Sequence, residues 1–230
     1  MGDMVTFASN GNDAAGYLAV PEGGSGPGMI VVQEWWGLDS GIKEMADRLA
    51  AEGFVALAPD LYHGELAGHT EMDKAGELMT TLPADRAARD MSGAVDYLAD
   101  HDATVGDGIG VMGFCMGGVL SFVLASLRPD KIKAAVPFYG FPQGDDQPDY
   151  SKIEASIQGH MAENDDFFPP AAAVELAERL RDMGKHVDIT VHAGTGHAFM
   201  APHNALGTAD PEASARIWPQ AVSFLHDHLG

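Results

Sequence analysis

The sequence has a single cysteine, Cys115, and no long apolar run. One cysteine cannot form an internal disulfide, which excludes a disulfide-stabilised fold and fits a reducing compartment. No segment approaches the roughly 18–20 uncharged residues that cross a bilayer. The first residues, Met1 to Asn12, have neither the basic start nor the apolar block of a signal peptide. We therefore expect a soluble, cytoplasmic protein.

Basic residues are also scarce. The chain has 13 Lys and Arg against 34 Asp and Glu, which gives a formal net charge of −21. Such a field repels the phosphates of nucleic acids and the headgroups of anionic membranes, so we expect neither as a partner. The carboxylates are scattered along the chain, and we interpret them as a solvated acidic surface instead of a docking patch.

Six apolar, β-prone runs recur along the chain, and segments with helical periodicity lie between them. This alternation predicts an α/β fold with a mostly parallel sheet and helices on both faces, formed by residues 1–230 as one domain. The segment from Met4 to Val20, which is punctuated by glycine around Asn10-Gly11-Asn12, predicts an antiparallel hairpin at the edge of the sheet. The six expected strands are Met29–Val32, Phe54–Ala58, Ile109–Gly113, Ala134–Tyr139, Ile157–Met161 and Val187–His192.

Two of the intervening segments have a clear apolar face. Apolar residues three or four positions apart lie on one side of a helix, which predicts that this side packs on the sheet. The expected buried residues are Ile42, Met45, Ala46 and Leu49 in the segment Ile42–Ala51, and Val174, Leu176, Ala177 and Leu180 in the segment Ala171–Met183.

Cys115 lies between the apolar strand Ile109–Gly113 and the helix-prone segment Val119–Leu127, in a Gly-x-Cys-x-Gly pattern. This pattern is typical of a nucleophile on a strained strand-to-helix turn, where Gly113 and Gly117 leave room for the tight backbone. A lone cysteine is more often a small buried residue, but this context favours a nucleophile. A free thiol has a pKa of about 8.5. Either the local field and a histidine lower that pKa, or a base removes the proton when substrate binds.

A histidine and an acid should follow the nucleophile along the chain in this fold. His197 lies in a glycine-rich loop directly after the strand Val187–His192, and we expect it to be the base. Asp165 and Asp166 lie beyond the carboxyl end of another strand, where open α/β sheets place their sites. One of the two is expected to orient the imidazole, and the other to interact with the positive end of the next helix.

Five motifs, in this order, resemble those of the dienelactone hydrolase family, and the resemblance covers nearly the whole chain. The motifs are Gln33-Glu34-Trp35-Trp36-Gly37, Ala58-Pro59-Asp60-Leu61-Tyr62, Gly113-Phe114-Cys115-Met116-Gly117-Gly118, Asp165 four residues before Pro169, and Gly196-His197-Ala198-Phe199.

The resemblance implies the α/β-hydrolase fold and a role for each of several residues. Cys115 would be the nucleophile, His197 the base and Asp165 its orienting acid. Glu34 would be an extra carboxylate that receives the thiol proton once substrate reorganises the site. The backbone N–H groups of Trp35 and Met116 would form the oxyanion hole.

The chain departs from relatives that act on dienelactones, which resemble one another in holding the substrate carboxylate with arginines. One of those arginines lies four residues beyond the histidine, where this chain has Ala201. The sequence therefore does not predict a preference for anionic lactones. Several aromatic residues suit a more apolar ester or form ordinary packing, namely Trp35, Trp36, Tyr62, Phe138, Tyr139 and Phe199.

Together these observations predict a hydrolase of small esters or lactones that forms an acyl-enzyme on Cys115. A thioesterase or another carboxylesterase on the same residues is an alternative, and so is a non-catalytic protein that binds a small molecule or senses oxidants. We find no second cysteine, no His-Glu-x-x-His and no phosphate-binding glycine loop, so we expect no metal and no cofactor. A monomer or a small homo-oligomer is expected.

Overall fold

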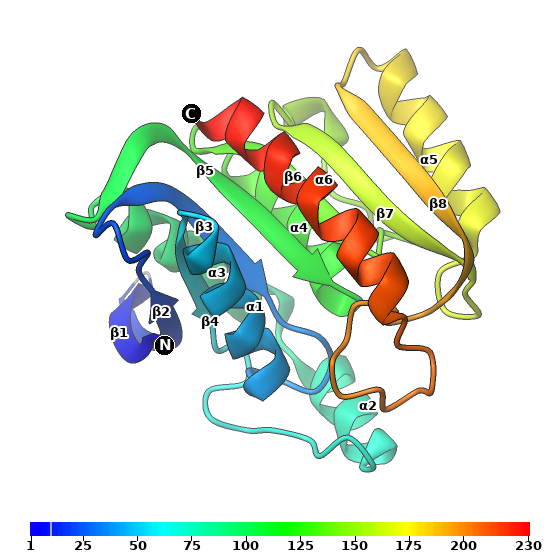
Figure 1. The fold of residues 1–230 in the computed structure, drawn as a ribbon, viewed down its shortest axis with the longest axis horizontal. Coiled ribbons are helices and arrows are strands. Elements are labelled where there is room, and N and C mark those ends of the chain that lie inside the picture. The colour runs from blue at the N-terminus through cyan, green and yellow to red at the C-terminus, as the bar shows by residue number, and fades with distance from the viewer. Residues whose placement is uncertain (10) are drawn as a thin grey trace.

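The computed structural model of the chain describes residues 1–9 and 11–230. Within these residues, eight strands form one sheet with the order β1-β2-β4-β3-β5-β6-β7-β8 (Figure 1). Strands β3 to β8 are all parallel to one another, whereas β2 runs antiparallel to both β1 and β4. The strands are β1 Asp3–Ser9, β2 Asn12–Ala19, β3 Gly26–Val32, β4 Val55–Pro59, β5 Thr104–Phe114, β6 Ile132–Phe138, β7 Ser156–Asn164 and β8 Val187–Gly196.

Helices cover both faces of the sheet, as the alternation predicts (Figure 1). Side chains of α1 and α6 pack on one face, and side chains of α3, α4 and α5 pack on the other. Every residue of β3 is buried between the two layers. No helix in the described part of the chain is long and apolar enough to cross a membrane. The helices are α1 Ser40–Ala51, α2 Met72–Thr81, α3 Ala84–Ala99, α4 Met116–Leu127, the 3-10 turn Tyr150–Lys152, α5 Pro170–Asp182 and α6 Pro211–Leu229.

The buried face of α1 is the predicted one, but the prediction for α5 is wrong at one position. Val174 is 42% exposed, and Ala173 is buried in its place. Ala173 shares a stripe with Leu176, Ala177 and Leu180, at spacings of three, four and seven residues. Val174 lies about 100° around the helix from Ala173 and faces solvent.

The antiparallel hairpin at the edge of the sheet is confirmed. Strands β1 and β2 pair from Asp3 opposite Leu18 to Ser9 opposite Asn12. The predicted turn includes Asn10, which lies outside the described residues. Helix α3 anchors the hairpin, because Ser9 Oγ donates to the buried carboxylate of Asp90 over 2.5 Å.

Candidate active site

Cys115 lies between β5 and α4 in a strained backbone conformation, with φ 54° and ψ −116°. The glycines around it are required by close backbone contacts. A Cβ on Gly113 would overlap the carbonyl of Gly117, and a Cβ on Gly117 would overlap the carbonyl of Val32. The Gly-x-Cys-x-Gly segment therefore forms the tight strand-to-helix turn that the sequence indicates.

His197 lies directly after β8, and its Nδ1 is 2.8 Å from Oδ2 of Asp165. The Asp165 side chain is fully buried, and its other oxygen accepts hydrogen bonds from the backbone N–H groups of Phe167 and Phe168. Because an ionised carboxylate only accepts hydrogen bonds, Nδ1 of His197 carries the proton and Nε2 is free to act as a base. Asp166 is exposed, so the structure pairs Asp165 with the histidine.

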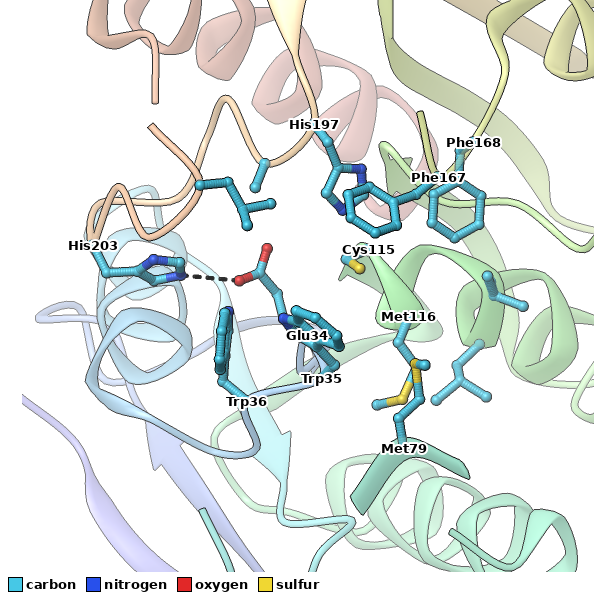
Figure 2. Close-up of a pocket in the computed structure, with 14 residues that line it drawn as sticks. Glu34, Trp35, Trp36, Met79, Cys115, Met116, Phe167, Phe168, His197 and His203 are labelled. Carbon is cyan, nitrogen blue, oxygen red and sulfur yellow. Dashed lines mark hydrogen bonds and ion pairs between the residues drawn. The ribbon is translucent and has the colours of Figure 1, made fainter. Parts of the chain in front are cut away.

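Cys115 and His197 line the same cavity, which has a volume of about 390 Å³. Figure 2 shows the Cys115 side chain between Glu34 and the imidazole of His197. The walls come from loops that follow several strands of the sheet and from the first turns of α4. The lining residues are Glu34, Trp35, Trp36, Met79, Cys115, Met116, Val119, Leu120, Phe167, Phe168, His197, Ala198, His203 and Leu206.

The surroundings of Cys115 favour the protonated form of its thiol. Burial raises its pKa well above the ordinary value, and the negative charge of Glu34 raises it further. The backbone N–H of Met116 only partly offsets these effects. Of the two routes to a thiolate, this environment favours removal of the proton when substrate binds.

Glu34 accepts a hydrogen bond at one of its two oxygens, and its carboxylate also lies near the buried hydroxyl of Tyr139: burial raises the pKa of Tyr139, and the charge of Glu34 raises it further. Oε2 of Glu34 accepts a hydrogen bond from Nε2 of His203 over 3.1 Å, and both side chains are less than a tenth exposed. Its Oε1 is buried and has no hydrogen-bond partner among the described residues. Burial alone would lower the pKa of His203, but the hydrogen bond and charge of Glu34 outweigh it and raise that pKa. An unpaired carboxylate oxygen thus lies in the cavity that contains the thiol.

A second histidine, His69, packs against His203. The rings of His69 and His203 stack with centroids 3.9 Å apart, and Nε2 of His69 lies 2.7 Å from a carboxylate oxygen of Asp39. Asp39, His69 and His203 each bring one potential ligand atom within 4.8 Å of the others. However, Nδ1 of His203 accepts from the N–H of Ala205, while its Nε2 is engaged with Glu34. A hydrogen-bond network explains this cluster, and we assign no metal to it.

The two amides expected to bind an oxyanion lie at the cavity wall. Trp35 and Met116 both line the cavity. In the described part of the chain, neither N–H donates to a backbone carbonyl outside the regular helices and strands. The N–H of Met116 is close enough to Cys115 to lower the pKa of its thiol, and an oxyanion hole requires donors next to the nucleophile.

The predicted substrate-binding residues divide into two groups. Trp36 lines the cavity and packs edge-on against His69, with ring centroids 5.4 Å apart. Trp35 also lines the cavity, whereas Tyr62, Phe138, Tyr139 and Phe199 are buried and do not line it. Tyr62 contacts the sulfur of Met116, and the ring of Tyr139 packs against both His197 and Phe199 at 5.2 Å. Their positions suit packing that orients the site.

The residues that line the cavity and that sequence reasoning missed include His203, Met79, Phe167 and Phe168. The two phenylalanines lie between Asp165 and the proline-opened helix α5, and their rings pack against His197 at 4.8 Å and 5.7 Å. An aromatic pair directly after the acid was a signal that could have found them. His203 had no such signal, because its contact with Glu34 spans 169 positions along the chain.

Comparisons with known proteins show which family the chain belongs to. Residues 14–229 match the model of the dienelactone hydrolase family. The chain is 40% identical to Protein usf of Aquifex pyrophilus and 36% identical to a putative carboxymethylenebutenolidase of Aquifex aeolicus, in both cases over 100% of each chain. A crystal structure of a putative dienelactone hydrolase from Klebsiella pneumoniae superposes with a TM-score of 0.84 at 24% identity, covering 99% of each chain. The protein therefore belongs to the dienelactone hydrolase family and is a carboxylic ester hydrolase with the α/β-hydrolase fold.

Proposed function

We propose that this protein hydrolyses small esters or lactones through an acyl-enzyme on Cys115, with His197 as the base and Asp165 as its orienting acid. One observation carries the proposal. Cys115, on its strained turn, lines the same cavity as His197, whose Nδ1 is bonded to the buried carboxylate of Asp165. The name carboxymethylenebutenolidase, given to the Aquifex aeolicus relative, supports a lactone or an ester as substrate.

In the first half-reaction, substrate enters the cavity and the thiol of Cys115 gives up its proton. The Oε1 of Glu34 is the acceptor, because Glu34 lines the same cavity and this oxygen accepts no hydrogen bond from the residues that the structure describes. The sulfur attacks the carbonyl carbon, and the N–H groups of Trp35 and Met116 bind the oxygen as it becomes negative. When the tetrahedral intermediate collapses, the C–O bond to the alcohol breaks and the leaving oxygen takes the proton that Glu34 received from the thiol, so Glu34 is again a carboxylate.

In the second half-reaction, Nε2 of His197 removes a proton from water, and the resulting hydroxide attacks the thioester. Asp165 stabilises the imidazolium that forms, because its Oδ2 accepts from Nδ1 of His197 over 2.8 Å. The carbon–sulfur bond breaks, the acid product leaves, and a proton returns to Cys115. No step requires a redox partner.

The test is turnover of a p-nitrophenyl ester together with the intact mass of the protein. Cys115→Ala should abolish turnover, and His197→Ala should accumulate an acyl adduct on the only cysteine of the chain. Asp165→Asn should lower kcat by about 10²–10⁴ because the imidazole loses its orienting partner. Asp166→Asn is the matched control, since Asp166 is the exposed neighbour, and its kcat should stay within about twofold. Unchanged turnover in Cys115→Ala would contradict the proposal.

The unchanged protein and the same variants also distinguish this proposal from two alternatives. A thioesterase or another carboxylesterase on the same three residues would prefer an acyl thioester or a larger acyl ester over a lactone in initial rates. A redox sensor needs a reactive thiolate at neutral pH, whereas burial and Glu34 raise the pKa of this thiol. If no ester, lactone or thioester is hydrolysed, a binding or sensing role replaces the proposal.

A further inference from the structure

The cavity offers no free positive charge to a substrate. Among its lining residues, all of which are described, there is no lysine and no arginine. The ionisable side chains there are Glu34, Cys115, His197 and His203. His197 is bonded to Asp165, so its charge is already matched by a carboxylate.

His203 is the remaining candidate to bind an anion, and both of its ring nitrogens are engaged. Nε2 lies 3.1 Å from Oε2 of Glu34, and Nδ1 accepts from the N–H of Ala205 over 3.1 Å. A substrate carboxylate near His203 would also approach the unpaired Oε1 of Glu34. Because like charges repel strongly in a poorly hydrated site, this half of the cavity disfavours anions.

The other half of the cavity is apolar. Figure 2 shows Met116 and, beyond it, Met79 on the side of Cys115 away from His203. Val119 and Leu120 of α4 and Phe168 complete this wall. An uncharged alkyl or aryl group gains by leaving water there, whereas an ionised group would lose its hydration without gaining a partner.

We infer that the substrates are uncharged esters or lactones whose acyl or alcohol part is apolar, and that the cavity rejects esters carrying a carboxylate. Met79, Met116, Val119 and Leu120 bind the apolar part. The paired Glu34 and His203 leave no cation for an anionic group. This inference rests on the proposed function and adds the chemical class of its substrate.

The first experiment compares two esters that differ only at the end of the acyl chain, p-nitrophenyl hexanoate and mono-p-nitrophenyl adipate. The terminal methyl group of one is a carboxylate in the other. After correction for spontaneous hydrolysis, kcat/KM should favour the hexanoate by about 100-fold or more, because the adipate brings an unpaired charge into the cavity. Equal values, or a preference for the adipate, would overturn the inference.

The second experiment adds one positive charge at matched positions on α2. Met79 lines the cavity and Met72 does not, while both methionines are similarly exposed, at 37% and 41%. Met79→Lys should narrow the preference for hexanoate by about tenfold, because it supplies the missing cation. Met72→Lys changes the net charge equally and should leave the ratio unchanged. Equal narrowing by both variants would assign the discrimination to the charge of the whole molecule and overturn the inference.

The proposed function and the inferred class of substrate can be contradicted independently of each other. If hexanoate turnover survives in Cys115→Ala, the proposed function fails. If turnover of both esters depends on Cys115 but the adipate is the better substrate, the nucleophile stands and only the substrate class is wrong.

Discussion

Cys115 is held in a conformation that costs an ordinary L-residue about 1–3 kcal/mol. Three backbone hydrogen bonds stabilise it. The N–H of Cys115 donates to Phe138, and its carbonyl accepts from Gly118 and Val119. The adjoining strand and helix therefore fix the backbone that carries the thiol. The reactivity of the sulfur then depends on the residues around it.

The raised pKa of the thiol leads to a prediction about its reactivity. Iodoacetamide reacts with thiolate, so the native protein should be alkylated slowly at pH 8, and the rate should still rise with pH above the ordinary thiol value of about 8.5. Glu34→Gln should alkylate several times faster at pH 8, because the negative charge of Glu34 contributes to the raised pKa. The measurement is the alkylation rate by intact mass between pH 7 and pH 10.

The unfolded chain in urea is the control for this experiment, because its thiol should titrate at the ordinary value. Equal alkylation rates in Glu34→Gln and the unchanged protein, with a midpoint near pH 8.5 in both, would show that neither burial nor Glu34 governs the thiol.

At the scale of elements, the contact between α3 and the N-terminal hairpin is close enough to exclude a methyl group. A Cβ on Gly93 would overlap the backbone carbonyl of Ala8, whereas a Cβ on Gly76 of α2 would meet no atom within 4 Å. Both glycines lie inside helices, where alanine is the better helix former by about 1 kcal/mol.

Gly93→Ala should therefore destabilise the protein by about 1–3 kcal/mol, because overpacking at a backbone contact outweighs the gain in helix propensity. Gly76→Ala is the matched control and should be neutral or slightly stabilising. Urea denaturation measures both. If Gly93→Ala is as stable as Gly76→Ala, the hairpin moves away from α3 at little cost.

The elements themselves could be predicted because a parallel sheet covered on both faces consists of continuous apolar runs. All six predicted core strands are present. The bounds of each strand differ from the predicted ones by at least one residue at one end or at both. Val174 was placed wrongly because apolar character alone does not define which stripe of a helix is buried. The turn at Cys115 could be predicted because the pattern that marks it, Gly113 and Gly117 two positions on either side of the cysteine, is local in the sequence.

The long-range contacts of the site could not be predicted in the same way. Of the residues that the chain order indicates, Cys115 and His197 line one cavity and Asp165 contacts His197, while their chemical roles stay predictions. The pairing of His203 with Glu34 depends on the path of the loop between β8 and α6, and no residue pattern encodes that path.

At the scale of the whole molecule, the net charge of −21 should oppose the compact state through self-repulsion. Salt screens this repulsion, because the Debye length falls from about 30 Å at 0.01 M to about 3 Å at 1 M. The melting temperature should therefore rise with NaCl over this range, by about 2–4 °C for each kcal/mol gained.

A variant with fewer charges separates this effect from a general salt effect. Asp145 and Asp146 are exposed in the loop after β6. The double variant Asp145→Asn/Asp146→Asn should melt higher at 0.01 M NaCl and gain less from added salt, in thermal scans that follow circular dichroism. A melting temperature that does not depend on salt would mean that repulsion among the acidic residues does not destabilise the folded protein.

The hydrogen bonds of Asp165 have a consequence for redesign of the enzyme. Phe167 and Phe168 narrow the cavity with their rings, and their backbone N–H groups also fix the carboxylate that holds His197. Widening the cavity from that side would therefore also loosen the imidazole, so selectivity and turnover would change together. In the part of the chain that the structure describes, no hydrogen bond joins Met79 or Leu120 to Asp165 or His197, so the wall that they form is the better place to engineer access for bulkier molecules.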